Sequence, residues 1–132
     1  MRRAEQLQGQ LADARSGRVV FLSHCLLNQN VRYLGGAGRA GGVSEVVDGY
    51  LGRGIGICQL PCPEQRAWGG VLKRRMLAAY ASAGTLRALL ARLLLRPFTW
   101  YTRRVYARLA RGVTQDILDY RRCGVEVTGL DR

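Results

Sequence analysis

Three short apolar runs, set far apart in the chain, constrain the fold more than any other feature of this sequence. They lie at residues 18–24, 55–60 and 125–130. The first run contains four consecutive apolar residues, a pattern typical of a strand that is covered on both faces of a sheet. The intervening stretches are long enough for the helical crossovers that parallel strands require. The sequence therefore predicts an α/β fold with a short, parallel, Rossmann-like sheet and crossover helices.

The stretches between the first two runs and after the second carry loop and turn signals. Residues 25–42 are rich in Gly and Asn and predict a long loop, a kind of segment that is usually functional or mobile. Residues 45–52 predict a helix with Ser44 as its N-cap. Pro61 and Pro63 follow the second run and predict a turn, because proline cannot continue a sheet interior.

Residues 71–120 predict two long helices that are separated at Pro97. Leucines recur at helical spacing in the first helix, at Leu86, Leu89, Leu90, Leu93 and Leu94. The predicted inward positions of the second helix are Tyr101, Val105, Leu109, Ile117 and Tyr120. Its predicted solvent-facing positions are Arg103, Arg104, Arg108 and Arg111.

The chain carries a large excess of positive charge. It has 132 residues, 21 Lys and Arg against 9 Asp and Glu, and a formal net charge of +12. Such a charge attracts polyanions, but arginine enrichment also follows from GC-rich coding, so no specific nucleic-acid partner is expected. Trp100 and Tyr101 beside Arg103 and Arg104 would suit weak peripheral contact with an anionic membrane.

Length and targeting signals define the expected organisation. Residues 1–17 predict a flexible N-terminal segment with a short helix, and residues 18–132 predict one α/β domain. No apolar stretch approaches the ~18 residues that a spanning helix needs, and the start lacks the pattern of a secretory signal. We therefore expect a cytoplasmic protein, in which cysteines serve as ligands, catalysts or core residues more often than in disulfides.

Two cysteines follow directly after the first two apolar runs. Cys25 comes just after the first run and Cys62 just after the second. If both runs are parallel strands, both thiols emerge at the carboxyl edge of the sheet, where open α/β sheets hold their ligands. Cys62 lies between two prolines that fix its backbone, and the carboxylate of Glu64 nearby could act as an acid or base. These thiols indicate metal or redox chemistry.

The two remaining cysteines and the histidine are expected to have structural roles. Cys58 is expected in the core, and Cys123 at the opposite edge of the sheet. His24, the only histidine, is expected to have a hydrogen-bonded structural role, with a Cys–His nucleophilic pair as the alternative. If the strand extends through His24, its side chain points opposite to that of Cys25. No pair of cysteines has the spacing of a structural zinc site.

Two segments carry a family resemblance. Residues 23–32, Ser-His-Cys-Leu-Leu-Asn-Gln-Asn-Val-Arg, and residues 59–64, Gln-Leu-Pro-Cys-Pro-Glu, resemble the motifs of the 2-thiouracil desulfurase family, formerly a domain of unknown function. The branch that they resemble most contains related desulfidases. The match covers residues 18–70 and, more loosely, residues 116–129. The order and separation of the two motifs make it fairly specific.

The resemblance implies an iron–sulfur enzyme that removes sulfur hydrolytically from a thiolated small molecule such as a thiopyrimidine. The family's 4Fe-4S cluster is held by three cysteines, and its open fourth iron takes sulfur from the substrate. By position, Cys25 and Cys62 correspond to two of these metal ligands. Glu64 and Ser23 are candidates for proton transfer.

The loop at residues 28–42 would line the substrate pocket in such an enzyme. Asn28 and Arg32 in this loop are expected to contact the substrate, with Arg32 available to an anionic or carbonyl group.

The chain departs from the family pattern at its third motif. Ser-Pro-Ser-Cys-Gly normally follows the strand that corresponds to residues 125–130, and it does not occur in this sequence. We therefore expect a C-terminally truncated chain with an incomplete sheet, which lacks the third cysteine ligand. Two alternatives remain open: the missing ligand comes from elsewhere, or this protein has lost the cluster.

Two further functions remain open from the residues themselves. One is a basic helical module that binds RNA or anionic membrane through residues 71–120. The other is a metal-free thiol enzyme that uses Cys25 or Cys62.

Overall fold

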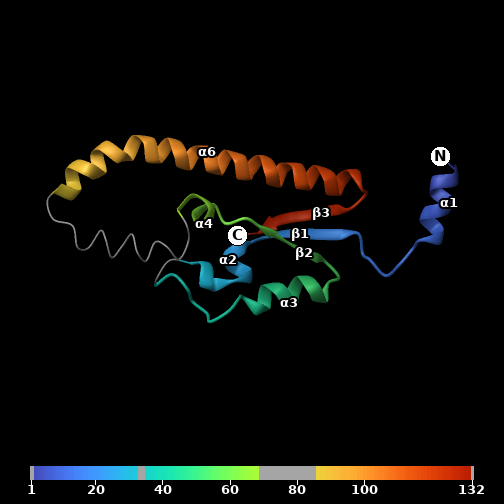
Figure 1. Cartoon of the computed structure of the whole chain (residues 1–132). Coiled ribbons are helices and arrows are strands. Elements are labelled where there is room, and N and C mark those ends of the chain that lie inside the picture. The colour runs from blue at the N-terminus through green and yellow to red at the C-terminus, as the bar shows by residue number, and fades with distance from the viewer. Residues whose placement is uncertain (1, 33–34, 69–85, 132) are drawn as a thin grey trace.

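The computed structural model describes residues 2–32, 35–68 and 86–131. Its centre is a parallel sheet in the strand order β2-β1-β3 (Figure 1). The strands are β1, Arg18–Ser23; β2, Gly56–Leu60; and β3, Glu126–Asp131. Strand positions differ from the predicted ones by a residue or so, and the α/β class with a parallel sheet is confirmed.

Strand β1 is buried on both faces, as its apolar run predicts. Val20 and Leu22 are 1% and 0% exposed and join Ile55 in the core on one face, beneath helix α3, Ser44–Gly52. On the other face, the ring of Phe21 meets that of Tyr120 edge-on at 5.9 Å between centroids. Tyr120 belongs to helix α6, Leu86–Arg122, so α3 and α6 cover opposite faces of the sheet (Figure 1).

The strand register brings the carboxyl ends of all three strands to one edge. Ser23 of β1 pairs with Leu60 of β2, and Leu22 pairs with Asp131 of β3. A bulge near the start of β3 shifts its register between Val19 and Val20, which bends the strand locally without moving it from the sheet. The chain segments that follow β1 and β2 therefore start side by side.

The predicted break at Pro97 is wrong. Helix α6 continues through this residue and curves in its N-terminal part (Figure 1). Proline removes one backbone hydrogen bond, to the carbonyl of the residue four positions earlier, which is Leu93. The side chain of Leu93 is 68% exposed, so this turn of the helix faces solvent. Water can satisfy the freed carbonyl there, and the helix bends instead of ending.

Most predicted faces of α6 agree with the structure. The four arginines predicted to face solvent are exposed, and the inward positions Val105, Leu109, Ile117 and Tyr120 are half-buried. Tyr101, by contrast, is 46% exposed, because this part of α6 extends beyond the sheet. The part of the predicted helix over residues 71–85 lies outside the described residues.

The loop and turn predictions need three corrections. The strand does not reach His24, which begins the one-turn helix α2, His24–Leu27, and a 3-10 turn, Gln29–Val31, follows it. Ser44 is the first residue of α3, and the N-cap is Val43 with no side-chain hydrogen bond. The turn predicted after β2 is instead helix α4, Pro63–Trp68, because proline is favoured at the first position of a helix.

Helix α1, Arg2–Gln10, lies apart from the sheet (Figure 1). Leu7 and Leu11 are 50% and 74% exposed, so the predicted short helix forms without an apolar partner. Beyond it, the Arg15 guanidinium hydrogen-bonds Asp13 and lowers the pKa of that carboxyl to about 2. Within the part of the chain that the structure describes, no helix combines the length and apolar character needed to cross a bilayer.

Candidate functional site

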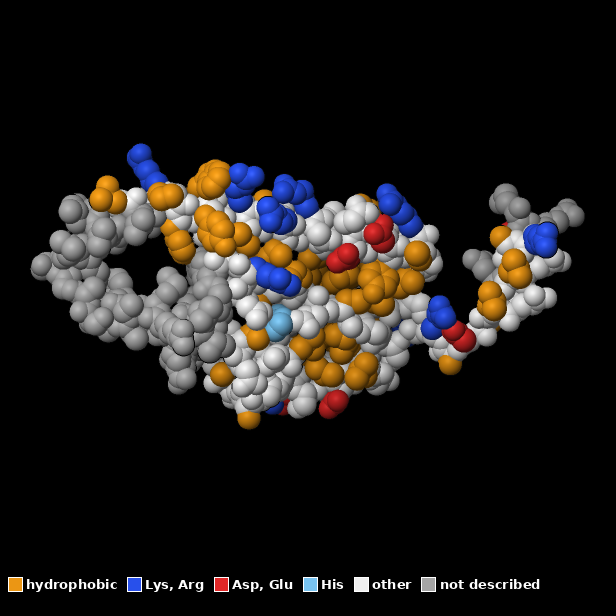
Figure 2. Space-filling view, in the orientation of Figure 1, with side chains coloured by type: hydrophobic (Ala, Val, Ile, Leu, Met, Phe, Trp, Pro, Cys, Tyr) orange, Lys and Arg blue, Asp and Glu red, His pale blue; other side chains and the backbone are white. Residues whose placement is uncertain are grey.

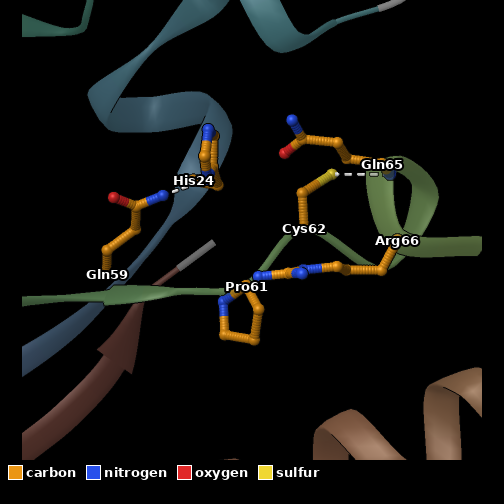
Figure 3. Close-up of a pocket in the computed structure, with 6 residues that line it drawn as sticks. All are labelled: His24, Gln59, Pro61, Cys62, Gln65 and Arg66. Carbon is orange, nitrogen blue, oxygen red and sulfur yellow. Dashed lines mark hydrogen bonds between the residues drawn. The ribbon is translucent and has the colours of Figure 1, made fainter. Parts of the chain in front are cut away.

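A pocket of about 720 Å³ opens at the carboxyl edge of the sheet (Figure 3). Residues from α2, the end of β2 and α4 line it: His24, Gln59, Pro61, Cys62, Gln65 and Arg66. Its volume is within the range of small-molecule sites, and it lies where α/β sheets usually bind ligands. The predicted position of the site, at this edge, therefore coincides with a real cavity.

Cys62 is the thiol of this pocket. It lies between Pro61, after the end of β2, and Pro63, at the start of α4. The backbone N–H of Gln65 donates to its sulfur at 3.5 Å, and Arg66 extends along the same wall (Figure 3). The sulfur of Cys62 therefore opens into the pocket beside a backbone donor, with a guanidinium in the same lining.

His24 and Gln59 form a second pair in the pocket. The side-chain amide nitrogen of Gln59 hydrogen-bonds Nδ1 of His24 (Figure 3). The hydrogen bond predicted for His24 is thus present. Because β1 ends at Ser23, the predicted strand alternation between His24 and Cys25 does not apply.

Cys25 lies at the same sheet edge but does not line this pocket. It is half-buried in α2, and its carbonyl accepts a hydrogen bond of 2.6 Å from the side-chain amide of Gln29. Among the described residues, no group of three or more His, Cys, Asp or Glu side chains is placed to hold a metal ion. The sheet brings the two predicted thiols to one edge, and only that of Cys62 opens into the cavity.

Neither of the other cysteines joins this edge. Cys58 is half-buried beneath α6, with its sulfur 3.3 Å from the hydroxyl of Tyr120. This hydrogen bond is the main cause that raises the pKa of Tyr120. Cys123 is exposed and precedes β3, at the opposite edge of the sheet. Both positions agree with the sequence-based expectation.

The predicted proton-transfer residues lie beside the pocket, not in its wall. Ser23 ends β1, and its hydroxyl donates to the carbonyl of Asp131 at 3.4 Å. Glu64 lies half-buried in the first turn of α4, two residues after Cys62. Their roles in proton transfer stay predictions.

The predicted substrate contacts also lie outside this pocket. Asn28 is the N-cap of the 3-10 turn. Its side-chain oxygen accepts hydrogen bonds of 3.1 and 3.0 Å from the backbone and side chain of Asn30. Arg32 is the C-cap of that turn and is exposed. Substrate contact by Asn28 and Arg32 stays a prediction.

The organising residue of this loop is Gln29, which sequence reasoning missed. It is 4% exposed, and its side-chain oxygen accepts from the backbone N–H of Gly38 at 3.0 Å while its amide holds Cys25. Gly42 lies so close to α2 that an added Cβ would be 2.6 Å from the carbonyl oxygen of Leu27. The returning loop is therefore fastened to α2, and it fixes the backbone around Cys25.

Gln65 and Arg66 were also missed as pocket residues. They follow Cys62 by three and four positions, the spacing that places side chains on one face of a helix. Pro63 was the available signal, since proline often occupies the first helical position.

A comparison of the chain with protein-family models, curated proteins and solved structures finds no match.

Proposed function

We propose that the carboxyl edge of this sheet is a desulfurase-like metal–thiolate site for a thiolated small molecule such as a thiopyrimidine. Cys25 and Cys62 would be two of its ligands. The observation that supports this most is the pairing of Ser23 with Leu60, which starts both cysteine-bearing segments side by side above a pocket. The motifs at residues 23–32 and 59–64 supply the chemical identity, by resemblance alone.

The described residues fit the implied 4Fe-4S cluster only in part. A cluster of that kind with one open iron needs three thiolates, whereas Cys58 and Cys123 lie elsewhere and no three-residue ligand group occurs among the described residues. We therefore derive no reaction step through a cluster. Strand β3 ends at this same edge, beside Leu22, and the resemblance places the family's third cysteine after this strand.

The side chains that line the pocket can bind a substrate and polarise its carbonyl group. The sulfur of Cys62 accepts a hydrogen bond from the Gln65 N–H and faces the pocket that Arg66 also lines. Arg66 can attract an anionic or strongly polarised carbonyl group of a substrate. His24 is held by its hydrogen bond with Gln59 at Nδ1, which leaves its other ring nitrogen for a ligand.

Anaerobic reconstitution tests the proposal. The purified chain is incubated with ferrous iron, sulfide and a small thiol that can fill the empty ligand position, and bound iron and visible absorption are measured. We expect a brown protein, and loss of most of the iron in Cys25→Ser and Cys62→Ser. Cys123→Ser, at the exposed opposite edge, serves as the matched control. A colourless protein, or equal iron in all three variants, would contradict the metal–thiolate site.

A metal-free thiol enzyme is the second candidate. It is favoured by the opening of the Cys62 sulfur into the pocket, where the backbone N–H of Gln65 donates to it and a small molecule can reach it. The same samples decide between the two candidates when they are treated with iodoacetamide. Rapid, selective alkylation of Cys62 in a colourless protein would support the thiol enzyme, and protection of Cys62 by bound iron would support the metal site.

A further inference from the structure

A second concave site lies between α4 and α6. It has a volume of about 450 Å³ and is lined by Arg66, Trp100, Tyr101, Arg104, Val105, Arg108 and Leu109. The lining thus combines three arginines and two aromatic rings with the half-buried apolar residues Val105 and Leu109. Trp100 and Tyr101 are 60% and 46% exposed, so both rings are accessible to a ligand.

The positive charge of this groove is not neutralised by the protein's own carboxylates. Within residues 2–32, 35–68 and 86–131, no ion pair involves Arg66, Arg104 or Arg108. The guanidinium of Arg104 lies over the Trp100 ring, 4.8 Å from its centroid. Such stacking orients the guanidinium without using its N–H donors, which match phosphate oxygens in pairs.

The positive surface continues along the helix. Figure 2 shows basic side chains interspersed with hydrophobic ones along α6, and Arg96, Arg103 and Arg111 are all exposed. The carboxylates of α6, Asp116 and Asp119, occur only further toward its C-terminal end. A ligand that carries several regularly spaced negative charges could therefore extend beyond the groove.

We propose that the groove between α4 and α6 binds single-stranded nucleic acid. Bases would stack on the exposed rings of Trp100 and Tyr101, and phosphates would pair with Arg66, Arg104 and Arg108. Alternating aromatic and basic groups in a concave site are the combination that binds single strands without base-specific contacts. The groove shares Arg66 with the pocket around Cys62, and the proposal needs no chemistry of the thiol.

The geometry favours a strand over a membrane surface. An interfacial helix needs a continuous apolar face turned to the lipid. The apolar positions Val105, Leu109 and Ile117 of α6 are instead half-buried within the protein. Leu93, Phe98 and Leu118 are exposed, and arginines such as Arg96 and Arg103 lie between them in the sequence.

Fluorescence anisotropy with labelled oligouridylate and oligothymidylate of about ten nucleotides tests the proposal. We expect binding of both single strands and weaker binding of a duplex of the same length. Arg104→Ala with Arg108→Ala should weaken binding by about tenfold at low salt. It should also make the slope of log K against log salt shallower by about 1.4, which corresponds to two lost phosphate contacts. Trp100→Ala should weaken binding by about tenfold through lost stacking.

The control is Arg121→Ala with Arg122→Ala, which removes the same charge from exposed positions of α6 outside the groove. An equal loss in both double variants, or equal affinity for duplex and single strand, would overturn the groove as the site. Oligonucleotide quenching of tryptophan fluorescence should disappear in Trp100→Phe, which retains Trp68. Binding to phosphatidylserine vesicles with no oligonucleotide binding would replace the proposal with a membrane surface. Circular dichroism establishes that each variant is folded.

Discussion

The pocket around Cys62 and the groove between α4 and α6 both use Arg66, but different forces hold their residues in place. The pocket stands on the buried strand β1, and the loop beside it is fastened by backbone contacts between Gly42, α2 and buried Gln29. The groove is formed by exposed side chains on two helices. We expect substitutions in the buried scaffold of the pocket to act through stability, whereas substitutions of exposed groove residues should act through binding.

The largest expected effect that separates these regions comes from two leucines. Leu22→Ala removes a side chain that is 0% exposed and should lower the free energy of unfolding by about 2–5 kcal/mol, because it leaves a cavity under the pocket. Leu93→Ala, at a position 68% exposed, should change it by less than about 0.5 kcal/mol. Urea unfolding followed by circular dichroism measures the free energy of unfolding of both variants. Similar decreases in the two variants would contradict the expected difference between the buried scaffold and the exposed helix.

Two neighbouring glycines test whether the loop beside the pocket is fastened to α2. Gly42→Ala places a Cβ 2.6 Å from the carbonyl oxygen of Leu27, whereas Gly41→Ala meets nothing within 4 Å. We expect Gly42→Ala to cost about 1–3 kcal/mol of overpacking and Gly41→Ala much less. Hydrogen exchange should show faster opening at Val43, whose N–H bonds the carbonyl of Leu26. Equal behaviour of the two variants would mean that the loop is not fastened there.

The smallest expected effect is a pH dependence at the sheet edge. Tyr50 donates a hydrogen bond of 2.9 Å to Asp131, and this bond raises the pKa of the tyrosine. A raised folded-state pKa gives stability that is fully present below the unfolded pKa of about 10 and is lost as the pH rises through the folded value. The stability difference between wild type and Tyr50→Phe should therefore be constant from pH 7 to about 9 and shrink above 10. Urea midpoints across this range measure it, and a constant difference at all pH values would contradict the bond.

Sequence reasoning found the parts of the fold that depend on local pattern. The apolar run of β1 identified a strand buried on both faces, and the spacing of the runs identified parallel strands. Reasoning about Pro97 failed because the cost of a proline depends on whether the freed carbonyl faces water, which only the position of Leu93 reveals. It failed at Pro63 for a related reason, since proline both ends strands and begins helices.

By itself, the sequence determined that Cys25 and Cys62 follow parallel strands and that the arginines of α6 face outward. Both results depend on periodicity along one element, which is a local property. Only the tertiary structure decided that Cys62 opens into a cavity with His24 and Gln59, that Gln29 is buried, and that Arg66 and Trp100 line one groove. These contacts join residues from different elements, and their formation depends on how the elements pack together, which no local pattern encodes.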